Sequence, residues 1–147
     1  MNVTIKNVGF EKIYDPYEIV TNFGTTSETD FIVHNNNADT ITSCILYISK
    51  TENLGDLDNP GTLEPYIDIE HIIQWGNEKT SDPNYIGFVA IVVDGTEYIV
   101  NSAQCNSKKN GIEVGPLVGG EQKTISIKVE VPASLASRRL FVNLVAE

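Results

Sequence analysis

The fold is decided by residues 112–147, which read IEVGPLVGGEQKTISIKVEVPASLASRRLFVNLVAE. Within this stretch, apolar and polar residues alternate over residues 124–131. Such alternation turns one face of a strand toward a core and the other toward water. Gly119-Gly120 supplies a turn before the strand, and Pro132 ends it because proline cannot donate to a β-ladder. A second apolar run follows over residues 140–145. The stretch therefore predicts two closing strands of a β-sandwich.

Similar strand-like runs, separated by turn signals, recur at residues 2–10, 17–21, 28–34, 41–49 and 86–100. Asp94-Gly95 divides the last run and suits the type I′ turn of a hairpin. Residues 66–75 fit a short helix nearly as well as a strand, and their β-branched content favours the strand. We therefore expect an all-β fold over residues 1–147, a single antiparallel two-sheet, immunoglobulin-like β-sandwich of about 7–10 short strands.

Length and composition agree with one globular domain. A chain of 147 residues with 41% apolar content can bury a core without disulfides or metal. The longest continuous apolar stretch, residues 88–93, is far shorter than the ~20 residues that cross a membrane. Cys44 and Cys105 are too few for a disulfide framework, so we expect two ordinary thiols, with a bridge between them as the less favoured alternative.

The net charge of −10 is unevenly distributed. Residues 1–100 carry a net charge of −12, whereas residues 101–147 carry +2. An acidic body repels phosphate backbones, so we expect no nucleic-acid partner. The favoured explanation of the negative net charge is that it keeps the protein soluble. The alternative is that an acidic face of one subunit meets the basic end of a neighbour.

The sequence contains no pattern typical of a catalytic or metal centre. His34 and His71 lack the ligand spacing of a zinc site. The segment GDLDNPG at residues 55–61 departs from the EF-hand pattern, although calcium in another loop geometry stays open. No GxSxG elbow is present, and the glycines at 115–120 precede a strand rather than a helix. We expect no enzyme activity, catalytic residue, metal or cofactor.

Several short patterns resemble those of small immunoglobulin-like β-sandwich structural proteins of tailed bacteriophages. The matching residues are Phe31-Ile32-Val33-His34-Asn35, Ser43-Cys44-Ile45-Leu46-Tyr47-Ile48, Trp75-Gly76, Ile112 with Gly115, Leu117 and Gly120, and the strand from Ile125 to Pro132. They span roughly two-thirds of the chain, and the resemblance is one of fold-level pattern. The Gly120-Glu121 turn that enters a strand is also similar to bacterial cell-surface immunoglobulin-like modules.

The phage resemblance implies a non-enzymatic virion structural protein, assembled in the host cytoplasm. It would be a head decoration or cement protein, or a tail or baseplate component, that forms a symmetric homo-oligomer and docks onto other virion proteins. For such contacts we expect aromatic anchors at Tyr66, Trp75 and Tyr85 and a basic contact at Arg138 and Arg139. The alternative is an extracellular or cell-surface carbohydrate-binding or adhesion module, in which the same aromatics stack on sugar rings. A core position for Trp75 competes with both roles.

Overall fold

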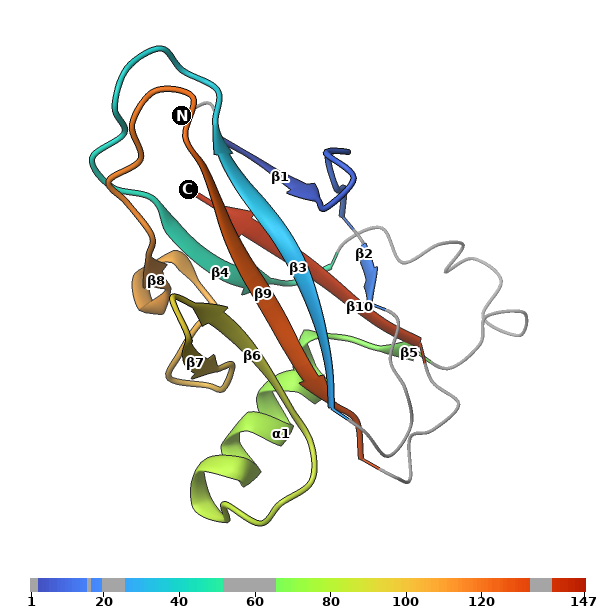
Figure 1. Ribbon diagram of the computed structural model, residues 1–147. Coiled ribbons are helices and arrows are strands. Elements are labelled where there is room, and N and C mark those ends of the chain that lie inside the picture. Colours follow the sequence, from blue (N-terminus) through green and yellow to red (C-terminus); the bar gives the residue numbers. More distant parts are fainter. Residues whose placement is uncertain (1–2, 16, 20–25, 52–65, 133–138) are drawn as a thin grey trace.

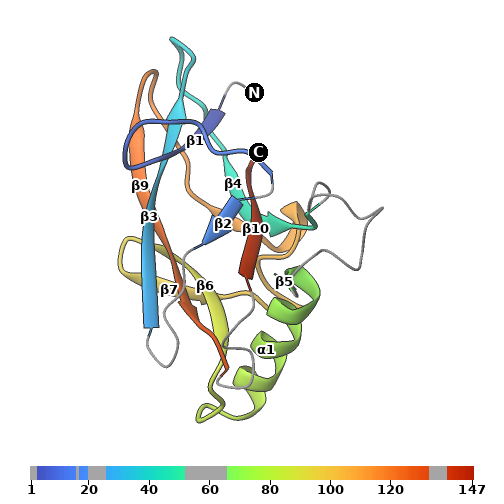
Figure 2. The ribbon, with the colours of Figure 1, turned by 90° about the vertical axis from the view of Figure 1, so that its right-hand side faces the viewer.

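Two β-sheets pack face to face in the computed structural model of the chain (Figures 1 and 2). The structure describes residues 3–15, 17–19, 26–51, 66–132 and 139–147. It confirms the expected all-β, two-sheet sandwich and adds one α-helix among the described residues. That helix, α1, lies at one end of the sandwich, away from both chain termini (Figure 1).

The first sheet has five antiparallel strands. In spatial order they are β1 (Val3–Asn7), β3 (Thr26–Asn35), β9 (Gln122–Glu130), β6 (Phe88–Val93) and β7 (Thr96–Ile99). The second sheet contains β2 (Tyr17–Ile19), β10 (Arg139–Ala146), β4 (Ile45–Ser49) and β8 (Ile112–Glu113) in antiparallel order, with β5 (Tyr66–Ile67) parallel to β10. The two strands expected from residues 124–131 and 140–145 therefore lie in different sheets.

The core lies between the sheets, where the alternation of the sequence places it. Ile125, Ile127 and Val129 of β9 are each at most 2% exposed. Leu46 and Ile48 of β4, in the facing sheet, are fully buried. Complete burial of one such aliphatic side chain stabilises the fold by about 1.5–3 kcal/mol. The alternation predicted for residues 124–131 is confirmed.

The hairpin predicted at Asp94-Gly95 is confirmed. β6 and β7 pair in antiparallel register, with Val93 opposite Thr96. Asp94 has φ of 51° and Gly95 has φ of 81°. Both central residues of a type I′ turn need positive φ, which aspartate tolerates and glycine adopts at no steric cost.

The strand expected over residues 66–75 is wrong beyond Ile67, because α1 spans Ile69–Ser81. Its buried residues are Ile69, Ile72, Trp75 and Gly76. Spacings of three and four residues put these side chains on one face of a helix, and that face packs against the core. The β-branched content that favoured a strand is explained by burial of this face.

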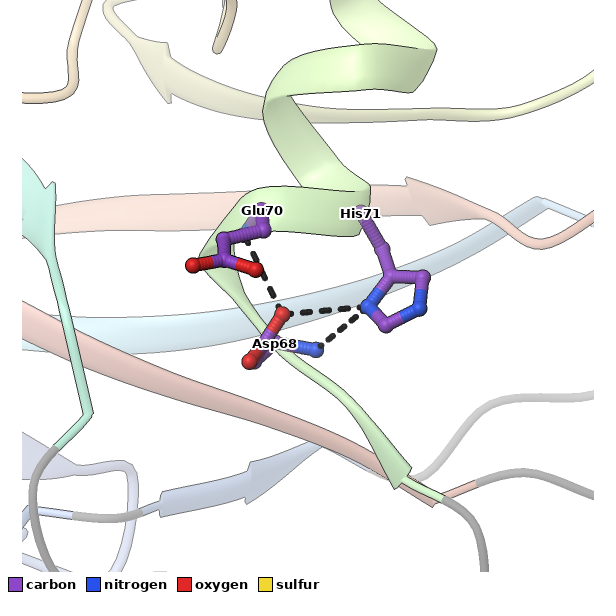
Figure 3. Close-up of polar contacts among 3 residues, drawn as sticks. All are labelled: Asp68, Glu70 and His71. Carbon is purple, nitrogen blue, oxygen red and sulfur yellow. Dashed lines mark hydrogen bonds and ion pairs between the residues drawn. The ribbon is translucent and has the colours of Figure 1, made fainter.

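The start of α1 is fixed by a reciprocal cap at Asp68 (Figure 3). The Asp68 carboxylate accepts the backbone N–H of Glu70 at 3.1 Å. The Asp68 backbone N–H points back to Nδ1 of His71 at 3.4 Å. A capping box usually carries Glu or Gln at the position that His71 occupies, so the usual sequence signature of a helix start is missing here.

Both cysteines are free and buried, which confirms the expected pair of ordinary thiols. Burial raises the pKa of the Cys105 thiol to about 12. Burial, followed by the nearby charge of Glu113, also raises the pKa of Cys44. Among the described residues, no helix is both long enough and apolar enough to span a membrane.

Candidate interaction site

Of the five residues expected to form contacts, the structure describes the side chains of three, and only Arg139 among these three is exposed. Trp75 is 3% exposed and packs in the core rather than forming a surface anchor. Tyr85 is half-buried and packs against the same core. Tyr66 and Arg139 are brought into register on the neighbouring strands β5 and β10. The Tyr66 side chain, Arg138 and the acidic loop at 55–61 lie outside the described residues.

Arg139 is exposed, but its guanidinium is already engaged within the chain. Nε and Nη2 donate to the two carboxylate oxygens of Glu18 at 2.9 and 2.6 Å. The guanidinium carbon lies 5.1 Å from the ring centroid of Phe141. The hydrogen bond from Arg139 holds the pKa of Glu18 below its usual value. A partner carboxylate at this position would therefore compete with Glu18.

Exposed apolar side chains concentrate instead in the connection between β1 and β2. Five large hydrophobic residues among those described are more than half exposed, namely Val8, Phe10, Tyr14, Ile86 and Val118. Three of these five lie within seven residues of one another, at exposures of 63%, 63% and 70%. Single exposed hydrophobic residues need no explanation, whereas three so close together in the chain make this connection the candidate interaction site.

Backbone hydrogen bonds shape the tip of this connection as a three-residue turn. The N–H of Phe10 donates to the carbonyl of Asn7 at 3.0 Å, and the N–H of Asn7 donates to the carbonyl of Glu11 at 2.8 Å. The side-chain oxygen of Asn7 also accepts the N–H groups of Gly9 and Glu11, at 2.9 and 3.0 Å. Asparagine suits this position because its side chain bonds the backbone two residues on.

The chain that leaves the tip pairs back onto β1. Ile13 donates its N–H to the carbonyl of Ile5 at 3.0 Å, and Lys6 and Lys12 form an antiparallel bridge. Ile13 also packs against the core. We call residues 5–14 the N-terminal hairpin. Figure 1 shows it at the β1 margin of the first sheet, on the side away from β6 and β7.

Phe10 occupies the tip in a strained conformation, with φ of 63°. Turns of this type place a left-handed residue at this point, where glycine is usual. A side chain other than glycine in that conformation costs about 1–2 kcal/mol. The ring is 63% exposed, so packing within the chain offsets little of this cost. Strain at an exposed residue points to a function outside the isolated chain.

The segment that carries the tip is neutral, in contrast to the acidic chain as a whole. Residues 3–15 contain two lysines, one glutamate and one aspartate, net zero, whereas the whole chain carries −10. Nζ of Lys6 donates to Nδ1 of His34 at 2.8 Å, and Nζ of Lys12 lies 5.5 Å from the ring centroid of Tyr14. Neither ammonium forms an ion pair with a carboxylate of the described residues. The tip therefore combines apolar rings with two lysines.

The surroundings of two other ionisable side chains, His71 and Cys105, are structural. The contact between Nδ1 of His71 and the Asp68 carboxylate, at 3.0 Å, belongs to the cap of α1 (Figure 3). Across the described ranges, no three His, Cys, Asp or Glu side chains converge as metal ligands. The raised pKa of Cys105 keeps its thiol protonated at neutral pH, and only a thiolate is a strong nucleophile.

The chain matches no protein-family model, no curated protein and no solved structure. Any function for the N-terminal hairpin must therefore be argued from its geometry. The sequence does contain a signal for it, because Val8 and Phe10 flank Gly9 directly after Asn7. Polar residues are usual in such a turn, and the apolar pair stands out against that expectation.

Proposed function

We propose that the chain is a non-enzymatic structural protein that docks onto partner proteins through the N-terminal hairpin. The observation that carries this proposal is Phe10, which is exposed and held in a conformation that glycine would adopt more easily. Strained residues cluster at functional sites, so the strain at Phe10 supports a role for its side chain. An immunoglobulin-like virion component, as the phage resemblance implies, is the setting we propose for it.

The energetics favour a contact made by the tip. Burying a phenylalanine side chain contributes about 1.5–3 kcal/mol, comparable to or larger than the ~1–2 kcal/mol of backbone strain at its position. Val8 and Tyr14 would add apolar area beside it. The backbone bonds around Asn7 fix the tip before binding, so less conformational entropy is lost when a partner orders it.

On a symmetric shell or tube, a weak contact of this kind is repeated many times, and the copies reinforce one another. The proposed partners are accordingly other virion proteins of a head or tail. The carbohydrate-binding alternative receives less support, because its central aromatic residue, Trp75, is buried in the core.

The test is incorporation into purified phage particles. We expect mass spectrometry to find the chain at a level stoichiometric with other structural proteins. Phe10→Gly should be lost from the particles, since glycine suits the backbone but removes the ring. Ile86→Ser removes an equally exposed apolar side chain on another part of the surface and should be retained. Absence of the wild-type chain from particles, or full retention of Phe10→Gly, would contradict the proposal.

A further inference from the structure

The outer face of the first sheet carries a hollow of about 320 Å³. It is lined by Glu28, Asp30, Val92, Asp94, Gly95, Thr124, Ile125 and Ser126. Thr124 and Ser126 alternate along β9 with the core-facing Ile125 and Ile127, so the hollow opens away from the core. Its lining comes from β3, β9 and β6 and from the turn that joins β6 to β7.

The hollow is acidic. Glu28 accepts a hydrogen bond from Oγ of Ser126 at 2.7 Å, and Asp94 pairs with Lys123 at 3.1 Å. Asp30 is exposed and forms no ion pair with the described residues. Beside the hollow, a hydrogen bond to Glu97 raises the pKa of Lys128, and the charges of Glu28 and Glu130 raise it further.

The N-terminal hairpin and the hollow are complementary in three respects. The hairpin offers the exposed Phe10 ring and Lys12, whose ammonium lies over the Tyr14 ring, and the hollow offers Val92 and the carboxylate of Asp30. The hollow lies near the lower end of the ~300–1,000 Å³ range of ligand sites, which suits one aromatic side chain. The hairpin stands at the β1 margin, whereas the turn that bounds the hollow stands at the β7 margin (Figure 1). The two can thus face different neighbours.

We propose that the hairpin docks into this hollow on a second copy of the chain, with Phe10 against Val92 and Lys12 near Asp30. The inference rests on the proposed docking function and names its partner. Two different surfaces meet, so the contact is head-to-tail and generates a ring or a filament rather than a two-fold dimer.

The experiment is sedimentation velocity of the purified full chain between about 10 μM and about 1 mM, the range in which a contact of this size is measurable. We expect reversible, concentration-dependent association. Phe10→Gly and Asp30→Lys should each weaken it at least about tenfold. The double variant Lys12→Glu with Asp30→Lys should recover part of the loss, because the charges are exchanged. Ile86→Ser and Lys109→Glu, with exposed side chains elsewhere, serve as the apolar and charge controls.

A wild-type chain that stays monomeric at the highest concentration would overturn the inference. So would association that Phe10→Gly leaves unchanged, or that Ile86→Ser weakens equally. The proposed docking function would survive any of these results if incorporation into particles still required Phe10. Conversely, the chain could associate through the hollow and yet be absent from phage particles. That result would refute the proposal of a virion component and leave the self-association inference standing.

Discussion

A buried asparagine holds together the two loops at the end of the sandwich where β3 ends and β9 begins. Asn35 is fully buried, and its Nδ2 donates to the carbonyls of Asp39, Leu117 and Val118, each at 3.0 Å. Its Oδ1 accepts the N–H of Asn37 at 2.9 Å. One side chain thus satisfies polar groups from both loops, which are distant in sequence. We predict that Asn35 contributes far more to stability than its size suggests.

The expected magnitude follows from these bonds. The two Nδ2 hydrogens and the Oδ1 oxygen of Asn35 account for three hydrogen bonds, and each intramolecular hydrogen bond contributes about 1 kcal/mol net to stability. Asn35→Ala should therefore reduce the free energy of unfolding by about 3 kcal/mol, the sum of the three hydrogen bonds that are lost. At about 2–4 °C per kcal/mol for a chain of this length, the melting temperature should fall by about 6–12 °C.

Asn35→Asp tests the same geometry by another route. The carboxylate keeps the shape but faces three carbonyl oxygens with no proton to donate, so it should destabilise more than alanine at neutral pH. Burial among acceptors raises the pKa of the introduced carboxyl in the folded state. The destabilisation by Asn35→Asp should therefore appear as pH rises above about 3.9, the pKa of an aspartate carboxyl in the unfolded chain, and diminish below that pH.

The assay is urea denaturation of the wild type and both variants, monitored by fluorescence and repeated from acidic to neutral pH. Asn36→Ala is the matched control, because Asn36 is exposed and should change stability by no more than about 0.5 kcal/mol. A loss below about 1 kcal/mol for Asn35→Ala would refute the role of Asn35 as the link between the loops.

Three further predictions concern the helix, the hairpin tip and the Arg139 pair. Gly76→Ala should destabilise the fold, because the new Cβ would lie 1.9 Å from the Val100 carbonyl oxygen, and this clash outweighs the higher helix propensity of alanine. An unchanged midpoint of urea denaturation would contradict this packing. Phe10→Gly should be more stable than Phe10→Ala by about 1 kcal/mol in thermal unfolding, since only glycine relieves the positive φ; the opposite order would exclude the strain. The pKa of Glu18 is lowered in the folded state, so ionised Glu18 stabilises the fold at neutral pH, and this stabilisation is lost as pH falls through the lowered pKa. Arg139→Met should remove this part of the loss of stability in acid. Identical profiles of stability against pH for the variant and the wild type would contradict the prediction.

The strands were predictable because their signal is local. Alternation with a period of two is visible in any window of β9, and the type I′ turn at Asp94-Gly95 needs only two residues. The pairing of β3 with β9 was not predictable, because it joins residues about a hundred positions apart and period alone does not choose a partner. The helix was the alternative over residues 66–75, and the β-branched content of that stretch favoured a strand; His71 in place of Glu or Gln also removes the usual signal of a helix start.

The interaction residues were harder to predict, because a residue type does not reveal its exposure. Trp75 was expected to serve as an anchor because tryptophan is common in binding hot spots, yet the helix turns its ring into the core. Phe10 was overlooked because turn rules place glycine or asparagine in its conformation. Exceptions to local rules are where function is expected. The apolar pair Val8 and Phe10 is visible in the sequence, whereas the positive φ of Phe10 is known only from the backbone of the turn.

The geometry of the N-terminal hairpin also limits how a partner can bind at the β1 margin. An uncovered edge strand invites another strand to pair with it. Here the carbonyl of Ile5 already accepts the N–H of Ile13, and Lys6 is bridged to Lys12. Along these residues the returning segment covers the edge of β1, so the docking that we propose would use the side chains at the tip. Phe10→Gly should therefore abolish docking while leaving the edge covered, and a loss of docking accompanied by aggregation would show that the edge itself was the contact.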